Sequence, residues 1–221
     1  MDLPPSSRVR VRRESQKGRY DRVTIDAILD DGFLCHVGVV QDDQPFVVPT
    51  GYVRDGDRIL IHGSAASRML NTAKAPVPVC VTVTHVDGVV LARSAFNSSI
   101  NYRSVMILGE MREVTEREDK LTALRMFTDH LVPGRWDDAR RVKDKELKAT
   151  SVLSLDLTEA SAKLRSGPPD DPDEDLDEPV WAGIVPLITR AGDPVADPSL
   201  RSGVELPAYL SPPTVPGLGE G

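Results

Sequence analysis

The sequence lacks the patterns that mark several large classes of catalytic and metal-binding proteins. It has two cysteines, Cys35 and Cys80, and both lie inside apolar runs, so we predict neither a disulfide framework nor a thiolate metal cluster. A G-x-S-x-G elbow, a G-x-G-x-x-G loop, a Walker loop and an H-E-x-x-H pair are all absent. If the protein is an enzyme, a bound cofactor must therefore supply the chemistry.

Long apolar runs and an excess of positive charge are also missing. No run approaches the roughly 18 residues of a membrane span, and MDLPPSSRVRVRR lacks the apolar core of a signal peptide. The net charge of −7 is local, because residues 170–178 hold seven carboxylates and the rest of the chain sums to zero. Such a balance gives no general footprint for nucleic acid, although the N-terminus is basic. We expect a soluble cytoplasmic protein that binds neither nucleic acid nor membrane.

The length fits one core with additions. Eleven of the 18 prolines follow Gly167, and PPDDPDEDLDEP cannot bury enough apolar area to offset its ordering entropy. We therefore divide the chain into a basic N-terminal arm (1–20), one domain (21–167), an acidic proline-rich linker (168–180) and a C-terminal extension (181–221). The run WAGIVPLI is apolar enough for that extension to dock in part.

Hydrophobic periodicity predicts an antiparallel meander of strands with flanking helices. A first helix is expected over 21–31, with Gly32 as a left-handed cap, and a second begins at a capping box formed by Thr115 and Glu118. A short helix is expected over 143–149. The expected strands are 33–40, 45–54, 58–63, 79–90 with a turn signal at Asp87-Gly88, 102–114, and a last strand at 151–157.

The stretch ILIHGSAASRM, residues 59–69, has the features of an anion site. A strand ends at His62 and Gly63, small and hydroxyl residues follow, and a helix is expected to start near Ser67. Free N–H groups at a helix start attract phosphate, and the Arg68 guanidinium can bind two of its oxygens. The alternative is an ordinary helix cap with a solvated arginine.

The order of these segments resembles the pyridoxamine 5'-phosphate oxidase-like superfamily. The segments are PFVVPTGYV, DGDRILIHG, SRM, VCVTV, YRSVMILGEMREV and EREDKLTAL, and the resemblance covers about residues 12–168. Within the superfamily the chain looks most like flavin-nucleotide-binding proteins of the 5-nitroimidazole resistance type. The resemblance implies an antiparallel six-stranded split β-barrel with flanking helices, a homodimer, and FMN bound between subunits.

By position, the resemblance also implies site residues. The flavin ring would lie beside the main chain of one strand, the ribityl chain over the end of the next, and the phosphate against Ser67 and Arg68. Met69 stands where the family often has a lysine, so one phosphate-binding cation is missing. The implied cofactor-binding residues are Pro49, Thr50, Gly51, Tyr52, His62, Gly63, Ser64, Ser67 and Arg68.

The implied activity is reduction or oxidation of a small molecule, with nitro compounds as candidate substrates. His62 is the candidate catalytic residue, and Asn101, Tyr102 and Arg103 are candidates at the substrate or subunit interface. Both groups also have ordinary structural interpretations, as a satisfied histidine and a polar loop.

Two other functions stay open. One is a haem-binding or haem-handling protein on the same barrel, because neutral imidazole is a common haem-iron ligand and His62 could serve as one. The other is a binding module without cofactor, which Met69 makes conceivable. A deazaflavin in place of FMN is a further alternative within the superfamily.

Overall fold

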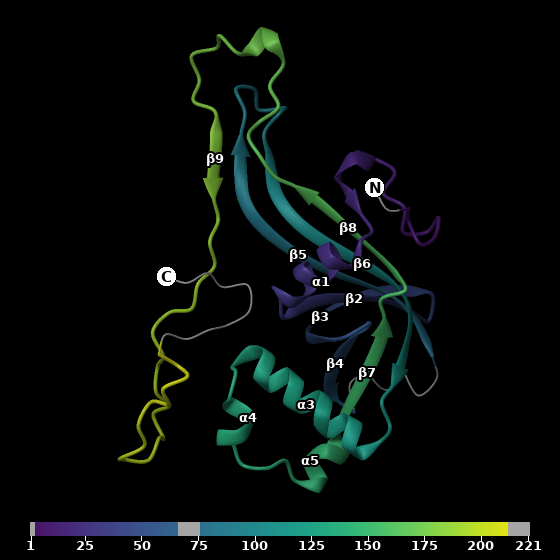
Figure 1. Ribbon diagram of the computed structural model, residues 1–221, viewed down its shortest axis with the longest axis vertical. Helices are drawn as coiled ribbons and strands as arrows, with labels where there is room; N and C mark the ends of the chain where they lie inside the picture. The colour runs from purple at the N-terminus through teal and green to yellow at the C-terminus, as the bar shows by residue number, and fades with distance from the viewer. Residues whose placement is uncertain (1–2, 66–75, 212–221) are drawn as a thin grey trace.

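The computed structural model describes residues 3–65 and 76–211, and in these ranges one nine-stranded antiparallel sheet curls around a core (Figure 1). The strand order is β1-β8-β6-β7-β4-β3-β2-β5-β9, and β5 also pairs with β6, which closes the barrel. The predicted split-barrel fold class is confirmed. The strands are β1 (Gly18–Arg19), β2 (Leu34–Gln41), β3 (Gln44–Asp55), β4 (Arg58–Ser64), β5 (Val77–Leu91), β6 (Ser99–Glu113), β7 (Thr150–Asp156), β8 (Glu159–Arg165) and β9 (Gly183–Pro186).

The barrel core comes from the alternate residues that the strand pattern predicts. Its fully buried side chains include Val37, Ile61, Ile107 and Leu155, one from each of four strands. Helix α1 (Arg22–Asp30) adds Ile25, Ile28 and Leu29 to the same core. Its start is capped as expected, because the Asp21 carboxylate accepts a 2.8 Å hydrogen bond from the Thr24 amide.

A second, smaller cluster lies outside the barrel under helix α3 (Arg117–Leu131). Ala123 and Phe127 of α3 pack against Val53, Leu60 and Val152, which lie on three adjacent strands. The short helices α4 (Arg135–Asp138) and α5 (Asp144–Ala149) follow α3 at the same end of the molecule (Figure 1). This face of β3, β4 and β7 is therefore covered by helix.

Two predicted helix caps were wrong. Gly32 is outside the left-handed region, and its role is close approach: a Cβ there would lie 2.8 Å from His85 Cε1 and 2.9 Å from the Tyr52 hydroxyl. Helix α3 begins after Glu116 with no side-chain cap, so Thr115 and Glu118 form no capping box.

Two strand predictions also need correction. Asp87-Gly88 is not a turn, because β5 runs through it with a bulge between Val86 and Gly88 in the pairing with β6. The strand at 150–156 is not the last, since β8 and β9 follow it. The sequence EASAKLR of β8 has no β-branched or aromatic residue, so its strand state comes from pairing with β6.

The segments on either side of the barrel domain contact it. In the acidic linker, the Asp171 carboxylate is buried and pairs with Arg93 at 2.9 Å. The extension adds β9 to the edge of β5. Farther along the extension, the Tyr209 hydroxyl donates a 2.6 Å hydrogen bond to Asp138, the last residue of α4. Within the described residues, no helix has the length and apolar character needed to cross a membrane.

Candidate functional site

Strands β3 and β4 separate at the place where the sequence predicts the flavin. They pair at four positions only, from Asp55↔Arg58 to Tyr52↔Ile61. Beyond Tyr52, strand β3 pairs with β2, whereas β4 beyond Ile61 continues along β7. The predicted segments 49–51 and 62–64 therefore flank the split from opposite sides.

The β3 side of the split is an open strand edge at residues 49–51. These residues pair with β2 on one edge, and no described strand pairs with their other edge. Pro45 and Pro49 suit such an open edge because proline has no amide to donate. Gly51 leaves space, since a Cβ there would meet only the Phe33 carbonyl, at 3.7 Å. Main-chain groups here are available to a planar ligand.

Tyr52 has a structural place beside this edge. Its side chain is 1% exposed, its hydroxyl donates a 2.6 Å hydrogen bond to the Leu29 carbonyl, and its amide donates to the Phe33 carbonyl at 3.0 Å. Burial raises the pKa of the phenol, so Tyr52 stays neutral. The residue fixes the last β3–β4 pair to α1.

On the β4 side, His62 points out of the barrel toward α3. Its ring lies edge-on to Phe127 with 4.2 Å between centroids, and its Nδ1 is buried without a hydrogen-bond partner among the described residues. Burial lowers the pKa of the imidazole, so the neutral form dominates near pH 7. A buried ring nitrogen without a hydrogen bond destabilises the folded state, so His62 is a candidate functional group.

His62 opens onto an apolar groove of about 390 Å³ between α3 and α4. Leucines and valines line much of it, with Phe127, Trp136 and Arg135. No group of three or more metal-ligating side chains occurs in the described part of the chain, so His62 is an isolated nitrogen donor in an apolar setting. That combination suits a large flat apolar ligand that needs one axial base.

The three interface candidates on β6 have partners within the chain. Asn101 is 6% exposed, accepts a 2.7 Å hydrogen bond from Arg165 and donates to the Gly167 carbonyl. Tyr102 is half-buried and lies opposite Arg165 of β8. Arg103 pairs with Asp31 at 2.6 Å and with Asp87 at 2.9 Å.

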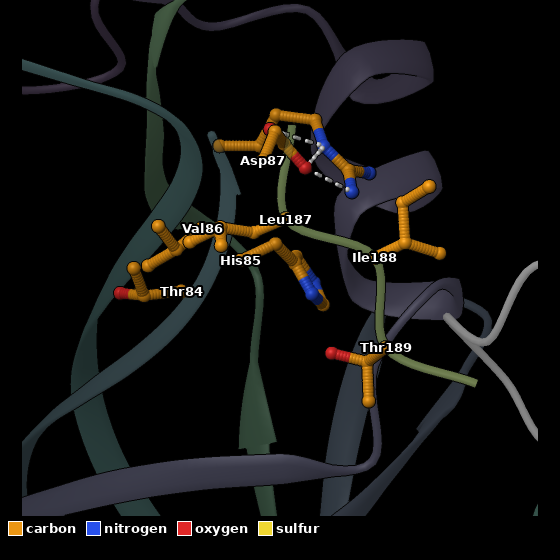
Figure 2. Close-up of a pocket in the computed structure, with 8 residues that line it drawn as sticks. Thr84, His85, Val86, Asp87, Leu187, Ile188 and Thr189 are labelled. Atoms are coloured by element: carbon orange, nitrogen blue, oxygen red, sulfur yellow. Dashed lines mark hydrogen bonds and ion pairs between the residues drawn. The ribbon is translucent and has the colours of Figure 1, made fainter. Parts of the chain in front are cut away.

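Arg103 lines a second cavity, of about 580 Å³, between β5 and the extension. Figure 2 shows His85 and Asp87 on one side and Leu187, Ile188 and Thr189 on the other. The Asp87 hydrogen bond, followed by that of Asp31, raises the pKa of Arg103, which stays charged. With two carboxylates already on it, this guanidinium is poorly placed to attract an anion.

Part of the predicted site lies outside the described residues. Ser67 and Arg68, with Met69, belong to this part, so the phosphate end stays a sequence prediction. Gly63 and Ser64 lie at the end of β4, opposite Ser151 and Thr150 of β7. Phe127 was overlooked as a partner of the His62 groove, because its helical spacing alone predicts a packing role.

The comparisons with known proteins agree with this geometry. The family model of pyridoxamine 5'-phosphate oxidase matches residues 21–164, which is more than half of the chain. The chain belongs to this family. The search of curated proteins found no match to the chain.

Solved structures add two relatives of similar length. The flavocytochrome Anf3 from Azotobacter vinelandii is 41% identical, with a TM-score of 0.92, over 97% of this chain and 100% of that one. A FAD- and haem-binding protein from Mycobacterium smegmatis is 38% identical, with a TM-score of 0.86, over 92% and 100%.

A more distant structure shares the fold. It is assigned to 5-nitroimidazole antibiotic resistance in Bacteroides thetaiotaomicron and is 20% identical, with a TM-score of 0.56, over 66% of this chain and 85% of that chain. The expected family is therefore confirmed by the family model, and this structure shows the same fold.

Proposed function

We propose that the protein is a flavin-binding redox protein that holds the isoalloxazine ring where β3 and β4 separate. The observation that carries this proposal is the divergence after the Tyr52–Ile61 pair, which leaves open main chain at 49–51 facing 62–64. Family membership over residues 21–164 supports it. When bound, a flavin supplies hydride or one-electron chemistry.

The chain's own residues bind and orient the ring in this proposal. The Pro49 carbonyl and the Gly51 amide and carbonyl face the ring edge, whereas the main chain of Thr50, like that of Tyr52, is turned toward β2. The rigid strand fixes the angle of the ring. Gly63 and Ser64 lie under the ribityl chain. Ser67 and Arg68 hold the phosphate, with Arg68 as the guanidinium that binds two of its oxygens.

FAD is the better-supported flavin, although the sequence resemblance implies FMN. One relative at 38% identity is a FAD- and haem-binding protein, and another at 41% is a flavocytochrome. Both alignments cover more than nine tenths of this chain and the whole of the relative's chain. We therefore propose a dinucleotide flavin at the same split.

Haem is the second cofactor that we propose, at His62. The neutral imidazole, its orphaned Nδ1 and the apolar groove between α3 and α4 fit a haem-iron ligand. Phe127 fixes the ring plane, and Trp136 with the surrounding leucines excludes water. Held at His62, haem would supply one-electron chemistry beside the flavin.

We also propose a homodimer through the outer face of β2 and β3. Leu34, Val40 and Val47 on this face are 49%, 64% and 67% exposed, and Pro45 and Pro49 lie among them. A second copy would cover this apolar face beside the split. Light scattering of the purified chain should give twice the monomer mass, 24.1 kDa per chain.

Titration of the purified protein with FAD, FMN and haem, each alone, tests these assignments. We expect flavin fluorescence to be quenched at a stoichiometry of one per chain, with FAD binding more tightly than FMN. We expect added haem to give a sharp Soret band. Binding of neither flavin would refute the function, whereas flavin binding without a Soret band would refute only the haem assignment.

A further inference from the structure

A groove of about 430 Å³ lies between the N-terminal segment and the outer face of β5, β6 and β8. Its lining includes four cationic side chains, Arg10, Arg12, Arg13 and Lys163, and no carboxylate. None of the four forms an ion pair with any carboxylate in the described ranges. Four like charges in one concavity focus a positive potential toward its centre.

Four hydroxyl side chains from β5, β6 and β8 lie along the floor of the groove. The pairing places Thr84 opposite Ser104 and Ser104 opposite Lys163. The neighbouring row runs from Thr82 through Met106 to Ser161. The Ser104 hydroxyl donates to the Lys163 carbonyl at 3.1 Å, and the other hydroxyls add donors beside the cations.

The N-terminal segment is anchored so that its arginines face the groove. Val9 is 1% exposed, the Val11 amide donates a 2.9 Å hydrogen bond to the Tyr20 hydroxyl, and Arg8 pairs with Glu159 at 2.9 Å. Val11 also packs against β1, since a Cβ on Gly18 would lie 3.0 Å from the Val11 Cβ. The arm therefore has a fixed place on the sheet, beside β8 (Figure 1).

The Glu14 carboxylate, next to Arg13 in the chain, already has a partner. Glu14 accepts a 2.7 Å bond from Lys17, and this bond is the main reason why its pKa is lowered; Lys163 and Arg13 contribute smaller effects. Because Lys17 neutralises Glu14, the groove keeps its positive charge.

We propose that this groove binds the diphosphate of a nucleotide. Guanidinium groups bind phosphate oxygens in pairs, and three arginines with a lysine exceed what one phosphoryl group needs. From Thr84 to Lys163 the floor spans two strand spacings, about 9–10 Å, which leaves room for two phosphoryl groups. Val11 and Met106, both half-buried, offer apolar surface to the organic part of the ligand.

The diphosphate has two possible sources, a free nucleotide or the ADP half of a dinucleotide flavin. The second source rests on the proposed function. His36 of β2 pairs with both Pro49 of β3 and Thr82 of β5, so a continuous row on one sheet face joins the split to the groove. We expect a free nucleotide to be the source, because in the proposed function Ser67 and Arg68 already hold one of the two phosphates of the flavin.

Calorimetry of the full-length protein with ADP as the probe tests the site itself. We expect ADP to bind, and the double variant Arg10→Ala/Arg12→Ala to lose at least about tenfold in affinity, the scale of one charged hydrogen bond. The matched control is Arg8→Ala, because Arg8 lies on the same arm but pairs with Glu159. Its ADP affinity should stay within about twofold of the wild type.

Two results would overturn the site: no ADP binding to the wild type, or an equal loss in the Arg8→Ala control. Circular dichroism checks that both variants fold. We expect them to fold because the substituted arginines are exposed. Competition identifies the source. If ADP displaces FAD and the double variant also weakens FMN binding, the flavin is the source, because the FMN phosphate is one of the two phosphates of FAD. ADP that binds equally to the flavin-loaded protein supports a free nucleotide. ADP binding without any flavin binding leaves the groove intact and refutes only the proposed function.

Discussion

The imidazole of His62 lies edge-on against the ring of Phe127, with 4.2 Å between the ring centroids. This contact joins strand β4 of the barrel to helix α3, and it leaves a neutral histidine at the mouth of an apolar groove. His62 faces α3 because side chains two residues apart on a strand point to the same face, and Leu60 already packs under α3.

His62→Ala should abolish the Soret band that haem produces and leave flavin affinity within a few-fold. The side chain faces α3, so its loss removes the proposed axial ligand without opening the β3 edge. Absorption spectra of the variant after haem addition measure this. His36→Ala is the control, since His36 is exposed on β2, and its Soret band should match the wild type. A normal Soret band in His62→Ala would exclude this ligand.

Tyr52→Phe should destabilise the fold by about 1–2 kcal/mol, because the Leu29 carbonyl at the end of α1 loses its buried hydrogen bond. Urea unfolding measures the change. Flavin affinity should stay unchanged, since the hydroxyl points at α1 and only the strand backbone faces the split. A variant of normal stability that had lost flavin would place the hydroxyl in the site instead.

Gly32→Ala should also destabilise the protein, by about 1–3 kcal/mol, as its Cβ would overlap His85 and Tyr52. Thermal unfolding compares it with Gly192→Ala, where a Cβ meets nothing within 4 Å. Equal melting temperatures for the two variants would show that the α1 end relaxes around the methyl group.

The sequence predicts most strands and both long helices, because their alternating or helical apolar patterns match the faces that they bury. It does not predict β8, whose small residues become a strand only beside β6. It also misses the roles of Gly32 and Arg103, since both depend on residues far away in the chain, such as His85 and Asp31. The family resemblance implied the residues at the split, whereas the N-terminal groove forms only when three strands are brought together.

Cys35 should resist thiol reagents in the folded protein. Burial raises the pKa of Cys35 to about 12, and burial also raises that of Cys80, so little thiolate exists at pH 8. Mass spectrometry after brief alkylation should find Cys35 unmodified, and modified after denaturation. Rapid native labelling of Cys35 would mean that the barrel opens at this strand.

Asp171→Ala should expose the acidic linker to protease. Its carboxylate is the buried partner of Arg93, and the loss should also cost about 1–3 kcal/mol of stability. Limited proteolysis with an enzyme that cuts after acidic residues measures the effect, with Asp170→Ala as the exposed neighbour for comparison. Identical digestion of the two variants would show that the linker is held elsewhere.

Flavin titration of Gly51→Val tests the central claim most directly. The Gly51 backbone is in an ordinary conformation and the nearest atom to an added Cβ is 3.7 Å away, so the variant should fold. Its side chain would stand on the open β3 edge and block the ring. We predict at least a tenfold loss of FAD affinity, with Gly192→Val binding FAD like the wild type. Unchanged FAD affinity in a folded Gly51→Val protein would contradict a flavin site at the split.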